Sequence, residues 1–411
     1  MYWARTLRIP AELLWFKLPD EKCQLATGEP PSPDALPAPD TSDDPERDPV
    51  LSAPWNHRGT VKVAVVLSGG DNRVKRRMFL SLTGPALTAP AHQWLVHEPE
   101  PLIAGLAGRR VSGELVSQLS TMVADLRKMD DVAGGGSVLT MAQQAFAWVT
   151  GLLDRARYDE HTGRALHIAL AELGQLCGWS AYDAGDYGLA QRYYVAGLRA
   201  AHSADDRPLG AHILAGMTYQ AACQGQPAEG VTLIETALAG TRGRATPTLL
   251  AELHIWQALA FATLRDTSAC TAAISQARIQ AEQLKPDDDP PWLYWLDPPT
   301  ITGMAGNCLL EIGRPDQAAV MLNEVIAQLS VPFVRNQWYF VTRLADALAR
   351  PGKQRDLDAA AGLGMQSIDL AESLDSHTVG RLRDLCFQMQ PHGTVPAVRD
   401  FLERAQGLVG G

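Results

Sequence analysis

Small, apolar and polar positions along this chain follow a pattern that recurs about every 40 residues. Five times, a helix pattern of small and apolar residues ends in a short break and is followed by a second, amphipathic helix pattern. The breaks fall at Gly185, Gly225, Arg265, Gly313 and Gly352, which are 40, 40, 48 and 39 residues apart. Such regular spacing predicts an all-α solenoid of stacked helical hairpins, an architecture that binds partners or ligands.

The clearest unit, residues 173–198, shows how two such helices would pack. Its first helix carries small residues at helical spacing, where another helix can approach closely: Gly174, Gly178 and Ala181. The unit resembles a tetratricopeptide repeat, whose small residues and turn glycine correspond here to Gly178, Gly185 and Ala190. The period is closer to 40 than to the length of about 34 residues usual for that repeat, so a HEAT-like pairing of helices is the alternative.

Prolines and capping residues mark the same helix boundaries independently. Thr246-Pro247 and Asp297-Pro298 each place an N-cap acceptor before a proline at the first helical position. Pro227 and Pro315 follow a turn glycine by two residues and predict the start of the second helix of their pairs. Two kinds of signal therefore agree on where the helices begin.

The pattern divides the chain into parts of different character. Residues 26–54 hold eight prolines and seven acidic residues, a composition that cannot bury enough apolar surface to offset its ordering entropy. We expect a further helical pair at 113–131 and 138–158, and terminal capping helices at 378–389 and 395–408. The expected divisions are an N-terminal remnant (1–22), a disordered acidic linker (23–57), an irregular connecting segment with a short strand at Val61–Leu67 (58–108), and the solenoid (109–411).

The remnant is a short amphipathic segment, residues 7–16, rich in large apolar residues that need a partner. It resembles the last helix of a helix-turn-helix domain of the repressor-like XRE class, in a family of actinobacterial regulators with a tetratricopeptide-like sensor domain. Further segments similar to that family lie between residues 75 and 405: Arg76–Gly84, Gly134–Gly136, Gly178-Trp179, Tyr182–Asp186 and Gln191–Tyr194. The resemblance implies a transcriptional regulator whose groove-reading helices would precede Met1 and are absent from this sequence.

Composition and charge narrow the classes of function. The net charge of −10 gives the chain no electrostatic footprint for nucleic acid, so DNA contact is expected only through the absent domain. No run of 18 apolar residues predicts a membrane span. The six cysteines form no C-x-x-C pair and fit small buried side chains of a reducing cytosol. We therefore expect a cytoplasmic protein without membrane contact.

Three short motifs imitate functional ones without the surroundings that those functions need. Arg76-Arg77 resembles a twin-arginine export signal but lies far from the N-terminus. Ser68–Asp71 resembles the nucleotide loop of ATP pyrophosphatases, which needs a parallel sheet behind it, but a helical pattern follows here. Gly134–Gly136 resembles a phosphate-binding loop, but no strand precedes it, so a turn between helices is favoured. The histidines show no metal-ligand spacing, and no catalytic constellation is discernible. We expect no enzyme, no cofactor and no metal site.

The candidate binding site is the groove that the first helix of each pair would line. One face of the clearest unit carries residues at three- and four-residue spacings: Glu172, Gln175, Trp179, Tyr182 and Asp183. Their counterparts in later units are Tyr219, His212, Thr263 and Asn307. Aromatic anchors beside a few polar groups suit a peptide or small-molecule groove. The alternative is that Trp179 and Tyr182 pack in the core.

The longest step of the repeat contains an insertion between helices, residues 284–300, which is rich in proline and tryptophan. It carries Trp292, Tyr294 and Trp295. An insertion with three large aromatic residues either covers an exposed groove edge or forms a lid over a ligand. The sequence leaves both interpretations open.

Together these observations predict the regulatory domain of a bacterial transcriptional regulator. A peptide, a small molecule or a protein would occupy the concave groove and shift the population of solenoid curvatures. That shift would change the spacing of paired DNA-binding units, which is compatible with a homodimer. The alternative function is a stand-alone protein-interaction scaffold of the tetratricopeptide class that does not bind DNA.

Overall fold

The structure of the protein, a computed structural model, describes residues 48–69, 80–101, 105–106, 108–133, 135–328, 334–371 and 376–409. The remnant expected at 1–22, most of the linker and the arginine pair at 76–77 lie outside the described residues. The described part is all-α, as predicted, apart from one pair of two-residue strands, β1 (Gly105–Leu106) and β2 (Arg157–Tyr158). These strands are antiparallel, with Gly105 opposite Tyr158.

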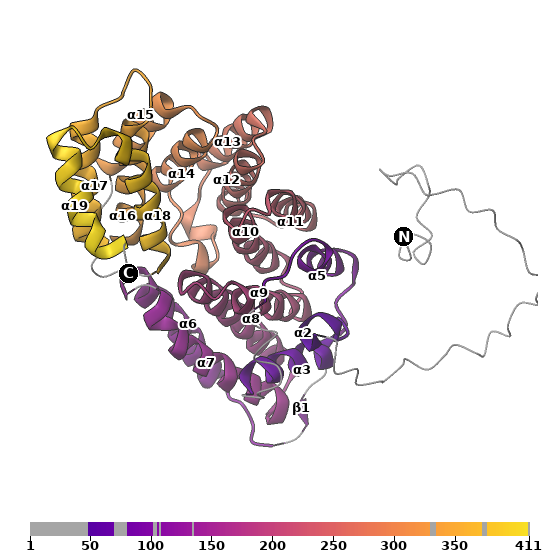
Figure 1. Ribbon diagram of the computed structural model, residues 1–411. Helices are drawn as coiled ribbons and strands as arrows, with labels where there is room; N and C mark the ends of the chain where they lie inside the picture. Colours follow the sequence, from indigo (N-terminus) through magenta and orange to yellow (C-terminus); the bar gives the residue numbers. More distant parts are fainter. Residues whose placement is uncertain are drawn as a thin grey trace, which may run out of the picture. The chain divides into compact units, whose positions relative to one another are not determined.

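The α-helices follow one another along the chain (Figure 1). Their bounds are α2 (Pro49–Ser52), α3 (His57–Ser68), α5 (Pro85–Val96), α6 (Gly113–Ala133), α7 (Gly135–Arg155), α8 (Glu160–Asp183), α9 (Tyr187–Ser203), α10 (Arg207–Cys223), α11 (Pro227–Gly240), α12 (Pro247–Thr263), α13 (Thr267–Ala281), α14 (Pro298–Glu311), α15 (Pro315–Ile326), α16 (Val334–Ala349), α17 (Leu357–Ala371), α18 (Ser376–Met389) and α19 (Pro396–Val409). The helical pairs expected upstream and downstream of the repeat are therefore present, as α6 with α7 and α18 with α19.

The predicted breaks are turns of one geometry. At the end of α8 the Gly185 N–H donates to the Tyr182 carbonyl and the Asp186 N–H to the Ala181 carbonyl, and Gly185 has a φ of +84°. This is the left-handed turn that commonly ends a helix, and it satisfies carbonyls that the helix leaves free. Predicted breaks with a positive φ at the same place in the turn are Gly185, Gly225, Arg265 and Gly313. The expectation that the helices end at these residues is confirmed.

The structure adds a turn of the same kind that the sequence pattern did not reveal. Asp205, between α9 and α10, has a φ of +51°, and the Asp206 N–H donates to the Ala201 carbonyl. Aspartate tolerates the left-handed region better than most residues, but it is a weaker turn signal than glycine. From Gly185 to Gly225 the chain thus reverses every 20 residues, which is half of the sequence period.

Helix starts agree with the expected capping residues. The Thr246 hydroxyl accepts a hydrogen bond from the Leu249 N–H, and the Asp297 carboxylate accepts one from the Thr300 N–H. The prolines predicted to open helices occupy the first helical position: Pro227, Pro247, Pro298 and Pro315. The fifth break, at Gly352, lies in the longer connection between α16 and α17, where the sequence required extra loop residues.

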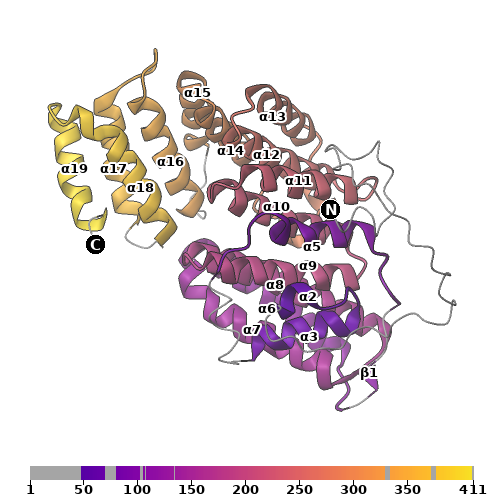
Figure 2. The ribbon, with the colours of Figure 1, turned by 45° about the vertical axis from the view of Figure 1, so that its right-hand side comes forward.

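Consecutive helices pack as pairs: α8 with α9, α10 with α11, α12 with α13, α14 with α15, and α16 with α17. The first helices of these pairs also contact one another in order, from α8 through α10, α12 and α14 to α16, as Figure 2 shows from a second side. Helix α6 contacts α8 at one end of this series and α16 at the other. The first helices and α6 therefore form a closed series of contacts around a common interior.

Glycines allow α8 and α9 to pack so closely that their backbones are in contact. A Cβ added to Gly174 would lie 2.7 Å from the Cα of Gly197, and one added to Gly178 would lie 2.6 Å from the ring of Tyr194. The stripe of small residues in the clearest unit is therefore a helix-packing surface, as expected.

The segment between 58 and 108 differs from the prediction. The run Val61–Leu67 forms part of the helix α3 and not a strand. Its buried residues Thr60, Val63, Ala64 and Leu67 recur at three- and four-residue spacings, a helical period that its β-branched residues masked. The Asn56 side chain caps the helix by accepting a hydrogen bond from the Gly59 N–H. Packing of α3 against α7 and α9 outweighs the strand preference of valine.

The end of the predicted linker is also ordered, because it binds buried arginines of α9. The Asp48 carboxylate lies 2.9 Å from the Arg192 guanidinium, and Arg199 donates to the carbonyls of Ala53 and Pro54 at 2.8 and 2.9 Å. Helices α2, α3 and α5 all contact α9 (Figures 1 and 2). The linker boundary expected at residue 57 therefore lies too late in the chain.

The buried His167, which contacts His57 of α3, predicts a loss of stability in acid. His57 and His167 stack with 3.1 Å between Nδ1 and Nε2. Burial, with the charge of His57 second, lowers the pKa of His167 to about 3. The unfolded chain, with a pKa near 6.5, therefore takes up protons first, and stability present above pH 6.5 is lost as the pH falls toward 3. At pH 5 the loss from His167 is about 2 kcal/mol.

Urea unfolding at pH 7 and pH 5 tests this expectation. His167→Gln should lose less stability over this interval than the unmodified protein. The control His161→Gln, at an exposed position of the same helix, should follow the unmodified protein. Equal losses in all three proteins would contradict the assignment.

Candidate functional site

The interior enclosed by the first helices contains a cavity of about 200 Å³. Its wall comes from α6, α8, α10, α12, α14 and α16, and from the insertion between α13 and α14. Much of that wall is aromatic: Trp179, Tyr219, Trp256, Trp292, Tyr294, Trp295, Trp338, Tyr339 and Phe340. The cavity is therefore built by helices far apart in the sequence.

Aromatic rings form a continuous surface along one side of the cavity. Trp179 stacks on Tyr219 with 5.4 Å between ring centroids, and Tyr219 lies 4.9 Å from Trp256. Trp292 of the insertion stacks on His212 at 4.6 Å. The Trp338 indole N–H donates to the Ser367 carbonyl, so the polar edge of this ring is satisfied by α17. The rings thus present apolar faces to the cavity.

Carboxylates interrupt this apolar wall. The Glu252 carboxylate lies 2.8 and 2.9 Å from Nδ1 of buried His212. Asp130 accepts a hydrogen bond from the Ser180 hydroxyl at 3.4 Å, and Asp131 accepts one from the Tyr294 phenol. Burial and this hydrogen bond raise the pKa of Tyr294, so its phenol remains protonated and acts as a donor.

The structure places most of the predicted groove residues in the cavity wall. Those that line the cavity are Gln175, Trp179, Asp183, His212, Tyr219 and Asn307. Glu172 does not line the cavity itself, but its carboxylate lies 3.0 Å from the guanidinium of the lining residue Arg127. Tyr182 is only 1% exposed and packs 5.4 Å from Tyr219, so it belongs to the core. Thr263 does not line the cavity, and its hydroxyl donates to the carbonyls of Leu259 and Ala260 in its own helix.

The insertion covers the cavity and supplies part of its wall. Trp292, Tyr294 and Trp295 all line it, and Trp292 is buried. The insertion is held at its ends by the hydrogen bond of Thr248 to Asp289 and by the Asp297 cap. The aromatic residues of this segment are therefore part of the site itself.

Sequence reasoning missed the contributions of α6 and α16. Arg127, Asp130 and Asp131 share one face of α6 at three- and four-residue spacings, which in an isolated helix indicates a solvated face. Their place in the cavity depends on the contact between α6 and α16, which no local pattern reveals. The only sequence signal for this part of the site was the helical spacing of the charged residues on α6.

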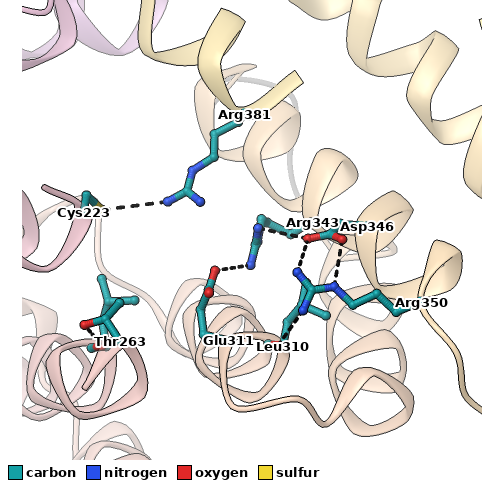
Figure 3. Close-up of polar contacts among 9 residues, drawn as sticks. Cys223, Thr263, Leu310, Glu311, Arg343, Asp346, Arg350 and Arg381 are labelled. Carbon is teal, nitrogen blue, oxygen red and sulfur yellow. Dashed lines mark hydrogen bonds and ion pairs between the residues drawn. The ribbon is translucent and has the colours of Figure 1, made fainter. Parts of the chain in front are cut away.

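A network of ion pairs lies beside the cavity, between α14 and α16 (Figure 3). Arg343 pairs with Glu311 at 2.6 Å and with Asp346 at 3.2 Å, and Asp346 also pairs with Arg350 at 2.9 Å. Arg381 extends from α18 toward Cys223 at the end of α10, with 3.8 Å between nitrogen and sulfur (Figure 3). The C-terminal helices therefore also contact the helices of the cavity.

Comparison with known proteins adds no assignment to this geometry. No protein-family model matches the chain, and no curated protein is significantly similar to it in sequence. Among the described residues, no group of three or more histidine, cysteine or acidic side chains is arranged to hold a metal ion. No helix in the described ranges combines the length and apolar character needed to cross a membrane.

Proposed function

We propose that this chain is the sensing domain of a regulator, a tetratricopeptide-like stack of helical hairpins that binds a small, largely apolar molecule in its interior. The observation that carries the proposal is the cavity of about 200 Å³ whose wall is shared by α6, α8, α10, α12, α14 and α16. The order of contacts among successive helix pairs supports the repeat class. A ligand there touches every pair from α6 to α16 at once.

The size of the cavity favours a small molecule as the occupant. A cavity of about 150 Å³ lined by apolar side chains holds benzene, so this one suits a molecule somewhat larger. A helix or a folded partner has a diameter of about 10 Å or more and needs an open groove. The volume of the cavity therefore matches a small molecule better than a helical peptide or a folded protein.

The docked N-terminal segment supplies a route from the cavity to a DNA-binding part. Helices α2, α3 and α5 pack on α9, and α5 also contacts α11. Helices α9 and α11 are the pair partners of α8 and α10, and α8 and α10 line the cavity. A ligand that binds one arrangement of these pairs better than another shifts the population toward it. In the proposed regulator the DNA-binding helices would precede this segment, so the shift would reach them through it.

Binding of a neutral aromatic probe tests the sensing function. Indole titrated into the full chain should give a saturable binding heat in calorimetry, because the aromatic rings of the cavity wall contact it. Met304→Trp fills the cavity from α14 and should weaken indole binding at least roughly tenfold. Met141→Trp, on the exposed side of α7, is the matched control and should bind as the unmodified protein does. Equal affinity in all three proteins would exclude the cavity as the site.

A separate measurement tests whether the proposed regulator acts in transcription. Protein isolated from its native cell should retain DNA from its own promoter, and Met304→Trp should alter that retention. Indole binding without any DNA retention would remove the transcriptional role and leave a ligand-binding domain of another kind.

A further inference from the structure

Acidic side chains outnumber basic ones around the cavity. The lining carboxylates among the described residues are Asp130, Asp131, Asp183 and Glu252, and the lining groups able to carry positive charge are Arg127 and His212. Arg127 also pairs with Glu172, and the charge of Arg381 acts on Tyr219 and Tyr339 from α18. Glu311 and Arg343 act on Tyr339 as well, so six carboxylates and four cationic groups lie in or next to the wall, and this negative balance favours cations over anions.

The aromatic wall favours the same sign of charge. Aromatic ring faces are negative because of the ring quadrupole, so any face of the lining rings that the stacking leaves open to the cavity attracts a cation placed over it. Protein sites that bind organic ammonium groups combine aromatic faces with carboxylates for this reason. A neutral apolar ligand would use the rings but gain nothing from the acids.

A buried acceptor supplies an independent indication of what the ligand carries. Asn307 lines the cavity from α14 and is 4% exposed, and its side-chain Oδ1 has no hydrogen-bond partner among the described residues. A buried acceptor without a donor is costly, so such groups usually have a partner. An N–H group of a bound ligand would satisfy this oxygen, whereas a quaternary ammonium has no proton to donate.

We infer that the ligand is a small organic amine, with a protonated primary or secondary ammonium joined to an apolar or aromatic body. The inference rests on the proposed function, because it names the chemical class that the sensing cavity takes. The ammonium donates to the Asn307 oxygen and to the acidic side chains, and the apolar body lies against the aromatic wall. The site then discriminates by charge between ligands of the same shape.

Three probes with one aromatic body test this inference on the full chain. Phenethylamine, 2-phenylethanol and 3-phenylpropionate carry an ammonium, a hydroxyl and a carboxylate, and each is titrated at pH 7 by calorimetry. Phenethylamine should bind at least roughly tenfold more tightly than 2-phenylethanol, since hydrogen bonds to charged groups are the stronger ones. The anion 3-phenylpropionate should bind more weakly than either.

Isosteric variants locate the charge recognition. Asp183→Asn should weaken phenethylamine binding roughly tenfold and leave 2-phenylethanol within about twofold, and Asn307→Leu should shift the same ratio in the same direction. Asp154→Asn, on α7 outside the cavity, is the matched control. If a variant fails to fold, as judged by circular dichroism, the comparison of probes on the unmodified protein decides.

The outcomes separate this inference from the proposed function. Equal affinity for phenethylamine and 2-phenylethanol would overturn the amine assignment and leave the sensing cavity in place. Failure of all three probes would overturn the amine assignment as well, and indole with Met304→Trp then shows whether the cavity binds any small molecule at all.

Discussion

Gly174→Ala is expected to destabilise the protein by about 3 kcal/mol, because α8 and α9 touch through their backbones at this position. The added Cβ would lie 2.7 Å from the Cα of Gly197, 2.9 Å from its nitrogen and 3.1 Å from the Tyr193 carbonyl oxygen. None of these atoms belongs to a flexible side chain, so the clash is relieved only if the helices separate. The gain in helix propensity from glycine to alanine, about 1 kcal/mol, offsets part of the cost.

Urea unfolding followed by circular dichroism measures this effect. The matched control is Gly362→Ala in α17, where an added Cβ meets no atom within 4 Å, so the same substitution should stabilise the protein slightly. If Gly174→Ala were as stable as Gly362→Ala, the close approach of α8 and α9 would be wrong.

Removing the Arg199 side chain should release the N-terminal segment and cost about 3 kcal/mol or more, since each hydrogen bond from a charged donor contributes about 1.5 kcal/mol or more. Arg199 is 1% exposed, donates to the carbonyls of Ala53 and Pro54, and lies 4.5 Å over the ring of Trp55. Burial lowers the pKa of Arg199 to about 10, and the side chain stays charged at pH 7. Arg199→Ala removes these contacts together.

Limited proteolysis distinguishes release of the segment from general unfolding. Trypsin should cut Arg199→Ala faster than the unmodified protein at Arg58 and Lys62, which lie in α3. Cleavage after Arg278 in α13 should proceed at an unchanged rate. The control Arg155→Ala removes an exposed arginine of α7 and should alter neither cleavage nor stability. Unchanged cleavage in Arg199→Ala would show that this arginine does not hold the segment.

Local signals in the sequence were sufficient to predict the helix pairs. Turn residues such as Gly225 and Gly313 and caps such as Thr246 act on their own few neighbours, so their effect is visible in a short stretch of sequence. The turn at Asp205 was not predicted, because aspartate adopts a positive φ here but is common in many other conformations and so is a weak turn signal. The helix at Val61–Leu67 was not predicted, because a run of β-branched residues is typical of a strand. Only the spacing of the buried positions, which the structure provides, shows the helical period.

Non-local contacts account for what the sequence could not show. Trp179 and Asp183 were predictable from one face of α8, and Tyr219 as their counterpart on α10. The acidic residues of α6 line the cavity only because α6 contacts α16. The ordering of Asp48 depends likewise on Arg192, which lies in another helix far along the chain. The periodicity of a helix carries no information about which distant helix completes its surroundings.

The contact between α6 and α16 has a consequence for biosynthesis. A ribosome releases the chain from its N-terminus, so α6 folds with its neighbours long before α16 emerges. Until then the interior is open on the side that Trp338, Tyr339 and Phe340 later close. A chain that ends before α16 lacks this part of the cavity wall, so under the proposed function it should not bind the ligand.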